Sequence, residues 1–418
     1  MPKIHLSFLF RSAALFAVIC ALASGIAAQK PINDLKRTVI LISIDGFRAD
    51  YFEKYSPPTL NGIATNGVRA RWMTPAFPSK TFPNHYTVAT GLYPAHHGIV
   101  ENNVWDFGTM FTMSKREEVQ NPRWWLGEPI WVTAEKQKQH AAAMFFPGTE
   151  SEIAGFRPTF WREYDGKVPN NDRVDAVLGW LDLPQAQRPT IYTMYFSDVD
   201  TAGHASSPDS QETGDAVIKV DGAIARLVNG LKARRIYDKV NLIIFSDHGM
   251  ATVDVSKTAV LDDFFDFNLA QDIIWTSEIV QIFPKPGEID TIAAKLASVS
   301  NAKCWKKGEI PARFHYNDGP RVAPIVCSAD EGGILTSRLR LADMKKRPGF
   351  GKPAGAHGYD NELVSMRAMF IARGPQFKRK KLAEAFPNVD VYELMCKILK
   401  LVPAKNDGNL ADVKNMLK

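Results

Sequence analysis

The sequence predicts an α/β fold with a mostly parallel sheet and helices on both faces. Three short apolar runs, 38–44, 191–196 and 240–245, have strand character, and a segment containing aspartate follows each of them. Between the second and third runs, apolar residues recur at helical spacing from Val217 to Leu231. Buried strands that alternate with amphipathic helices are typical of a sheet covered on both sides.

The length of 418 residues, 45% of them hydrophobic, allows one elaborated domain with a large core. A fourth strand-like run, 366–372, follows His357 and resumes the pattern. The stretch from about 255 to 350 interrupts it with shorter runs and turns, which predicts a smaller inserted cap. We therefore expect a core domain over 36–402 that contains this cap, followed by a C-terminal tail over 403–418.

The first 28 residues have the layout of a secretory signal peptide. Lys3 and Arg11 accompany an apolar stretch, 13–23, and small residues follow through Ala28. An uncleaved membrane anchor is the alternative, but the stretch is shorter than the roughly 20 residues that a spanning helix needs. We expect a secreted or periplasmic protein with no stable membrane insertion after cleavage.

The net charge and the cysteine content give little information about what the protein binds. The formal charge is +6, and Lys3 and Arg11 of the N-terminal segment supply two of these charges. This balance is too mild to predict a macromolecular nucleic acid as partner. In an oxidising compartment Cys304 could bridge to Cys327, whereas Cys396 lies in an apolar helical pattern and is expected to be a buried thiol.

Potential metal ligands follow the predicted strands. In open α/β sheets ligands bind at the carboxyl ends of strands, so these residues should converge on one edge. Each histidine taken singly is more often a hydrogen-bonded core residue than a ligand, but the set as a whole favours metal binding. Oxygen and nitrogen ligands of this kind suit zinc, and seven are too many for one tetrahedral ion. The candidates in chain order are Asp45, Thr81, Asp200, His204, Asp247, His248 and His357.

Thr81 is predicted to lie at the start of a helix. The pattern of 85–90 is helical and ends at Gly91, and Pro83 suits the first turn of a helix. The free backbone N–H groups there attract anions. A threonine at this place is most often a simple helix cap, but a cap can also be a nucleophile if a metal activates its hydroxyl.

Taken together, these segments resemble the nucleotide pyrophosphatase/phosphodiesterase family of the alkaline phosphatase superfamily. The resemblance extends over about 37–400, and the ordered set of segments is far more specific than any one of them. They are Ile42–Arg48, Pro78–His85, His97–Asn103, Asp200–His204, Ser246–Met250 and Gly355–Gly358.

The resemblance implies an alkaline-phosphatase-like core that binds two Zn²⁺ per chain. Asp200, His204 and His357 are similar to the ligands of one zinc. The other zinc would be held by Asp45, Thr81, Asp247 and His248.

The resemblance also implies roles in catalysis and substrate binding. Thr81 would be the nucleophile, and Asn102, helped by the backbone N–H of Phe82, would donate to a phosphate oxygen. Phe82 and Tyr195 resemble an aromatic pair that holds a nucleobase, although Tyr195, within a strand run, could equally be core. Phe146 stands where the family often has tryptophan, and the orientation of Glu101 is left open.

The implied activity is zinc-dependent hydrolysis of phosphodiester and pyrophosphate bonds in nucleotides and related small diesters. Thr81 would attack phosphorus to give a phosphothreonine, which water then hydrolyses. The alternatives are a lysophospholipid or other lipid-headgroup phosphodiesterase, a phosphomonoesterase or phosphonate hydrolase, and a non-catalytic binding protein. The intact ligand set disfavours the last of these. The leaving group and the oligomeric state stay open.

Overall fold

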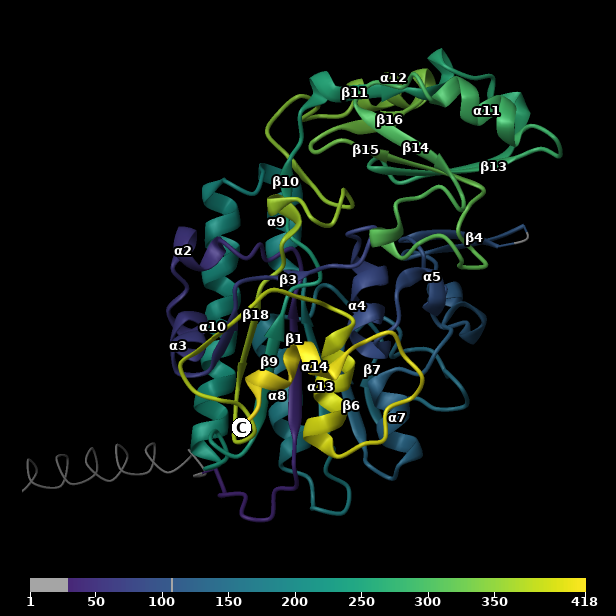
Figure 1. The fold of residues 1–418 in the computed structure, drawn as a ribbon. Helices are drawn as coiled ribbons and strands as arrows, with labels where there is room; N and C mark the ends of the chain where they lie inside the picture. The colour runs from purple at the N-terminus through teal and green to yellow at the C-terminus, as the bar shows by residue number, and fades with distance from the viewer. Residues whose placement is uncertain (1–28, 107) are drawn as a thin grey trace, which may run out of the picture.

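The computed structural model describes residues 29–106 and 108–418, so the expected signal peptide lies outside the described residues. An eight-stranded sheet forms the centre of the core (Figure 1). Its order is β19 (Lys381–Ala383), β2 (Val68–Ala70), β18 (Phe370–Arg373), β9 (Asn241–Phe245), β1 (Val39–Ile44), β8 (Ile191–Phe196), β6 (Ala141–Met144) and β7 (Phe160–Arg162).

The sheet is parallel except at one strand. Pairing is parallel from β9 through β1, β8 and β6 to β7, whereas β18 runs antiparallel to both β9 and β2. The run predicted over 366–372 is strand only from Phe370, because the Met366 carbonyl accepts the Gly249 N–H and Val364–Met366 forms a 3₁₀ turn. The other three predicted strands match within a residue or two.

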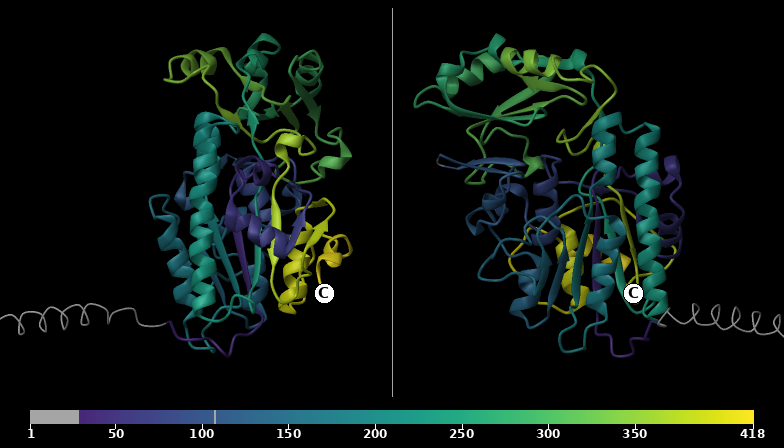
Figure 2. Two further views of the ribbon diagram at one scale, coloured as in Figure 1. Left: turned by 90° about the vertical axis from the view of Figure 1, so that its left-hand side faces the viewer. Right: turned by 180° about the vertical axis from the view of Figure 1, so that it is seen from behind.

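Helices cover both faces of the sheet, as predicted (Figure 2). Residues of β1 alternate between the two layers: Ile40, Ile42 and Ile44 face one, and Val39 and Leu41 face the other. The first layer is formed by α2 (Tyr51–Tyr55), α3 (Pro58–Asn66), α8 (Asn170–Leu181) and α10 (Gln211–Ala233). The second contains α4 (Thr81–Thr90), α7 (Ile130–Lys136) and α13 (Asp390–Leu399).

A smaller lobe lies over one end of the core (Figure 1). Its antiparallel sheet has the order β12 (Ala270–Trp275), β13 (Ile279–Pro284), β15 (Ile325–Ala329) and β14 (Ala302–Lys306), with α11 (Ile289–Leu296) beside it. A parallel pair, β11 (Thr258–Val260) and β16 (Ile334–Thr336), and α12 (Arg338–Lys345) complete the lobe. The chain enters the smaller lobe after β10 (Ala251–Thr252) and returns to the core through β17 (Gly355–Ala356). These two strands pair with each other.

The described cysteines form one disulfide and leave one buried free thiol. Cys304 of β14 and Cys327 of β15 are opposite each other and form a disulfide in the smaller lobe. Cys396 of α13 is a free thiol buried in the core, and burial raises its pKa to about 12.

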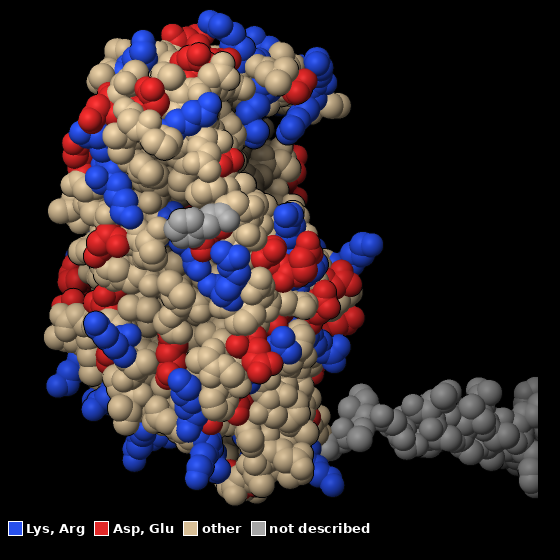
Figure 3. Space-filling view, turned by 90° about the vertical axis from the view of Figure 1, so that its right-hand side faces the viewer, with Lys and Arg blue, Asp and Glu red and all other residues tan. Residues whose placement is uncertain are grey.

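The segment expected as a tail is packed against the core. It contains α14 (Leu410–Val413), and Val413 and Met416 are buried in the layer of α13. No helix in the described part of the chain combines the length and the apolar character needed to cross a bilayer. Basic and acidic side chains are interspersed over both lobes on the face drawn in Figure 3.

The remaining elements connect these layers. They are β3 (Met73–Thr74), α5 (Pro94–His97), β4 (Asn103–Asp106), β5 (Thr109–Thr112), α6 (Arg116–Val119), α9 (Asp198–Ser206) and β20 (Phe386–Pro387), with short 3₁₀ turns between them.

Candidate active site

Six predicted ligands converge at the carboxyl ends of β1, β8 and β9, beneath the smaller lobe. Asp45 directly follows β1, and Asp247 and His248 follow β9, where the backbone leaves the sheet. Asp200 and His204 lie one turn apart on α9, which begins after β8. His357 comes from the other side, directly after β17. The topology thus assembles residues that are more than 300 positions apart.

The six side chains form two adjacent groups. Ligand atoms of Asp200, His204 and His357 lie within 4.8 Å of one another, and so do those of Asp45, Asp247 and His248. In the first group the two Nε2 atoms are 3.1 Å apart. In the second, His248 Nε2 lies 3.4 Å from Asp45 Oδ1 and 3.0 Å from Asp247 Oδ2. These groups match the division that the resemblance implied.

All three histidines are oriented by backbone carbonyls. The Nδ1 atom of His204 contacts Gly355 O at 2.8 Å, that of His357 contacts Ser79 O at 2.8 Å, and that of His248 contacts Gly249 O at 2.9 Å. Since a carbonyl can only accept, each Nδ1 carries a proton, and Nε2 is the ring nitrogen that faces the cluster. Such outer hydrogen bonds are typical of metal-ligating histidines.

One oxygen of each carboxylate in the cluster lacks a hydrogen-bond donor. Asp45 Oδ1, Asp200 Oδ1 and Asp247 Oδ2 are buried and have no hydrogen-bond partner within the described residues. Burial, with repulsion from Asp247 and Asp200, holds the pKa of Asp45 well above its ordinary value. Buried carboxylates are normally paired or metal-bound. Orphaned oxygens beside three imidazole Nε2 atoms therefore fit divalent cations, and this set of ligand atoms suits zinc.

Histidine neighbours shift pKa values in both groups. Burial alone would raise the pKa of Asp247, but His248 and His85 outweigh it and hold that pKa well below its usual range. Burial, together with the neighbouring His248 and His204, keeps the pKa of His357 well below its ordinary value. His357 is thus held as a neutral imidazole, the form in which histidine ligates a metal.

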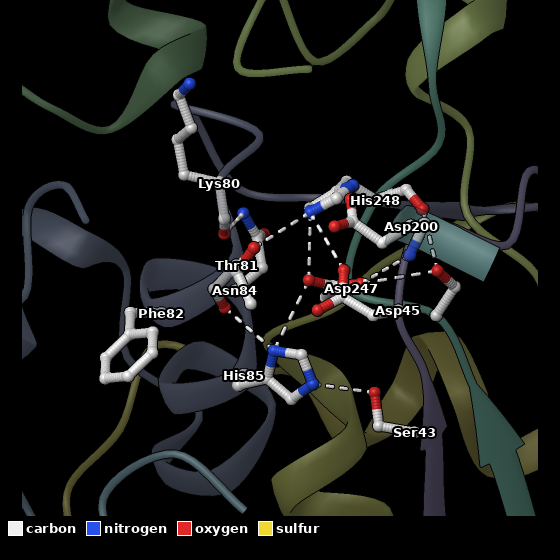
Figure 4. Close-up of polar contacts among 12 residues, drawn as sticks. Ser43, Asp45, Lys80, Thr81, Phe82, Asn84, His85, Asp200, Asp247 and His248 are labelled. Carbon is white, nitrogen blue, oxygen red and sulfur yellow. Dashed lines mark hydrogen bonds and ion pairs between the residues drawn. The ribbon is translucent and has the colours of Figure 1, made fainter. Parts of the chain in front are cut away.

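Thr81 is the first residue of α4, as the sequence predicted (Figure 4). Its Oγ1 lies 3.3 Å from His248 Nε2, so the hydroxyl borders the second ligand group. The helix ends at Gly91, which has the left-handed conformation (φ 68°). The site thus combines a hydroxyl, the N-terminal end of a helix and the ligand cluster, a combination suited to binding a phosphoryl group.

Asn102 is attached to the first turn of α4. Its Oδ1 accepts the backbone N–H of Phe82 at 2.9 Å, which leaves the Nδ2 protons available to another acceptor. We expected the Phe82 N–H to donate to a phosphate oxygen alongside Asn102. In this structure that N–H orients Asn102 instead.

A pocket of about 290 Å³ opens beside Thr81. Phe82 and Tyr195, for which the resemblance implies a role in holding a nucleobase, both line it. Tyr195 is 9% exposed and its hydroxyl donates to Asp45 Oδ2 at 2.5 Å, so it also holds a candidate metal ligand in place. Phe146, the aromatic substitution noted in the sequence, is another wall residue, and its ring contacts His85.

Sequence reasoning missed several residues of the pocket. Tyr164 lies 6.0 Å from Tyr195 between ring centroids and is 39% exposed, and Arg116 forms an ion pair with Glu150 at the pocket wall. These residues come from segments whose local pattern carries no chemical signal. The tertiary structure alone brings them to the site.

Three buried polar residues support the site from behind. His85 contacts Ser43 Oγ at 2.7 Å, the Thr81 carbonyl at 2.8 Å and Asp247 Oδ2 at 3.4 Å. Lys80 and Glu101 both extend to the smaller lobe, so Glu101, whose orientation the sequence left open, does not line the pocket.

Comparison with known proteins points to one family. A family model described as type I phosphodiesterase / nucleotide pyrophosphatase matches residues 39–360. An uncharacterised pyrophosphatase/phosphodiesterase of Schizosaccharomyces pombe is 39% identical over 406 residues, which are 94% of this chain and 82% of that protein. Rat ectonucleotide pyrophosphatase/phosphodiesterase family member 3 and a venom phosphodiesterase of Crotalus durissus collilineatus are each 37% identical over 410 residues. That match covers 95% of this chain but 46% and 48% of theirs, so the chain spans about half their length.

Solved structures show the same fold. Murine ectonucleotide pyrophosphatase/phosphodiesterase 5 superposes with a TM-score of 0.85 at 33% identity, covering 91% of this chain and all of that one. An inactive variant of the murine protein in complex with AMP also has a TM-score of 0.85, at 32% identity over 92% of this chain and all of that one. The predicted α/β architecture is thereby confirmed.

Proposed function

Because the chain belongs to the type I phosphodiesterase / nucleotide pyrophosphatase family, we propose that it hydrolyses phosphodiester and pyrophosphate bonds of nucleotides through a phosphothreonine at Thr81. The observation that carries this proposal is the position of the Thr81 hydroxyl. It lies at the N-terminus of α4, 3.3 Å from His248 Nε2, in the wall of a pocket that aromatic residues also line.

Two zinc ions complete the proposed site. Asp200, His204 and His357 would hold one, and the other would be held by Asp45, Thr81, Asp247 and His248. When bound, they would supply Lewis-acid charge that lowers the pKa of the Thr81 hydroxyl and balances charge on the phosphoryl oxygens. The orphaned carboxylate oxygens and the Nδ1 hydrogen bonds that turn each Nε2 toward the cluster support this assignment.

The chain's own residues account for the rest of the reaction. In the first step a bond forms between Thr81 Oγ1 and phosphorus while the bond to the leaving oxygen breaks, and the Thr81 proton passes to solvent. In the second, a water oxygen bonds to phosphorus and Thr81 Oγ1 departs with the electron pair and regains a proton. Asn102 Nδ2 would donate to a phosphoryl oxygen, adding to the field of the helix N-terminus.

The pocket favours a nucleotide over a bare phosphate ester. Phe82 and Tyr195 present aromatic surface next to the reacting hydroxyl, with Tyr164 further out. The AMP complex of the murine relative supports a small nucleotide as the substrate class.

We also propose that the mature protein is secreted or periplasmic, and that the region of about 255–350 acts as a cap over the site.

A paired turnover assay tests the proposed activity. The purified chain is assayed with a nitrophenyl nucleotide diester and with nitrophenyl phosphate, before and after chelation and with zinc added back. We expect zinc-dependent turnover with a strong preference for the diester. A preference for the monoester would assign a phosphatase, and turnover that survives complete metal removal would refute the metal assignment.

A further inference from the structure

We propose that the turn between β12 and β13, Thr276–Glu278, is a clamp that positions the nucleophile and the phosphate-binding asparagine relative to each other. The proposal rests on the proposed function of Thr81 and Asn102. Each of these residues directly follows a buried charged residue, Lys80 or Glu101, that contacts this one turn. Lys80, Glu101, Thr276 and Glu278 are thus positioning residues, not groups that touch substrate.

The first half of the clamp acts on Thr81. Lys80 is the N-cap of α4 and 5% exposed, and its Nζ pairs with Glu278 and donates to the Thr276 carbonyl at 3.3 Å. Its side chain extends away from the carboxylate cluster (Figure 4). The Lys80 side chain also packs against Gly358. A Cβ added to that glycine would lie 2.3 Å from Lys80 Cε. The start of α4 is therefore held against both the turn and the segment after β17 that contains His357.

The second half acts on Asn102. Glu101 is completely buried, its Oε1 accepts the Thr276 hydroxyl at 2.9 Å, and its Oε2 accepts the Asn103 N–H at 3.2 Å. A buried carboxylate needs such partners, so the backbone at Asn102 cannot shift without breaking them. The same threonine therefore contacts both halves, through its carbonyl to Lys80 and its hydroxyl to Glu101.

The chemistry explains why such a clamp would matter. Thr81 and Asn102 belong to different segments, and next to the reacting hydroxyl these segments are joined by the bond from the Phe82 N–H to Asn102. Displacement of a reacting group by about 1 Å can cost roughly 100-fold in rate. An anchor common to both segments would keep the hydroxyl and the amide donor at a constant separation.

Two variants of the full chain test the clamp. Glu278→Gln removes the charge that faces Lys80, and Thr276→Val removes the hydroxyl that faces Glu101 while keeping the side-chain shape. Glu309→Gln is the matched control, because it removes a carboxylate of the smaller lobe from an exposed pair with Lys306. The readouts are kcat and KM on a nitrophenyl nucleotide diester, zinc content, and amide hydrogen exchange of the metal-free protein.

The two clamp variants should lower kcat by about 10- to 100-fold with little change in KM or zinc content. Their amide exchange should accelerate over 79–85 and 100–104 but not over β1. Glu309→Gln should match wild type in every readout. Unchanged kcat and unchanged local exchange in both clamp variants would overturn the proposal, as would acceleration spread over the whole chain. If wild type turned over no diester, the proposed function would fail, whereas the exchange measurement would still decide the clamp.

Discussion

The side-chain oxygen of Asn102 accepts the backbone N–H of Phe82 at 2.9 Å, which connects the loop after α5 to the first turn of α4. The bond fixes the orientation of the carboxamide, because only Oδ1 can accept an N–H. The Nδ2 protons are thereby left for another acceptor. In the proposed function, Asn102 is thus a donor that is already oriented before substrate binds.

Replacement of Asn102 should distinguish its bond from the Phe82 N–H from its own hydrogen-bond donation to the substrate. Asn102→Asp can still accept the Phe82 N–H but loses the donor and adds negative charge next to the phosphate. We expect kcat/KM on the nucleotide diester to fall by about 100- to 1,000-fold without loss of stability. The exposed Asn66→Asp on α3 is the control. An activity of Asn102→Asp within threefold of wild type would remove Asn102 from the site.

The nucleophile can be tested by retaining or deleting its hydroxyl. Thr81→Ala should lower kcat on the diester by roughly a thousandfold or more, because no side-chain oxygen is left to attack phosphorus. Thr81→Ser keeps the hydroxyl and should retain measurable turnover. Quenched-flow labelling with a ³²P diester should trap phosphate on the wild-type chain but not on Thr81→Ala. Full turnover by Thr81→Ala would exclude it as nucleophile.

Removal of His357 should act on one metal site selectively. Asp200 and His204 alone would give that ion too few ligands, whereas the group with Asp45, Asp247 and His248 is unaffected. His357→Ala should therefore bind about one zinc per chain where wild type binds two, as measured by atomic emission after dialysis. His96→Ala, a half-exposed histidine outside the cluster, serves as control. Retention of two ions by His357→Ala would refute its assignment as a ligand.

Asp390 should make stability depend on pH. Burial raises the pKa of this carboxyl to about 7, and the carboxyl accepts the Asn409 N–H at 2.7 Å. The folded state thus binds a proton more tightly than the unfolded state, for which the pKa is near 4. This contribution to stability is present at low pH and is lost as the pH rises toward about 7.

The Asp390→Asn variant isolates that contribution. It should gain thermal stability relative to wild type as the pH increases from 5 to 8, because it cannot ionise. Differential scanning calorimetry at both pH values measures the change. The exposed Glu384→Gln, which pairs only with Arg71, should show no such trend. A difference between Asp390→Asn and wild type that is the same at both pH values would contradict the raised pKa.

The disulfide should stabilise the smaller lobe. Bonding Cys304 to Cys327 closes a loop with a sequence separation of 23, for which about 3 kcal/mol of stabilisation is typical. Peptide mapping without reductant should recover residues 304 and 327 on one linked fragment, and Cys304→Ser/Cys327→Ser should unfold at lower urea. Cys396→Ser provides the control for loss of a thiol alone. Recovery of both cysteines as free thiols from oxidised protein would exclude the bond.

Much of the site was predictable because its chemistry is local in sequence. Asp45, Asp200 and Asp247 each follow a strand that its own apolar run identifies, and Asp200 and His204 have the spacing of one helical turn. Parallel strands end at the same edge, so convergence of these residues followed from the fold class. Thr81 was placed at a helix start by the helical pattern before Gly91 and by Pro83.

Other features depended on contacts between distant segments. No local pattern indicates that the Tyr195 hydroxyl binds Asp45, that Tyr164 lines the pocket, or that Glu101 points to Thr276. The local sequence of a buried strand is the same whether one of its side chains contacts an apolar group or a carboxylate.

The sequence by itself determined the α/β architecture and indicated the candidate metal ligands, because strand and helix periods and the residue types at strand ends are properties of short segments. The resemblance carried by its motifs added the candidate nucleophile, Thr81. Only the tertiary structure decided that Tyr195 also binds Asp45, that Tyr164 and Arg116 line the pocket, and that Lys80 and Glu101 meet one turn of the smaller lobe. The physical reason is that these outcomes depend on side-chain packing and burial across hundreds of residues, which local preference does not encode.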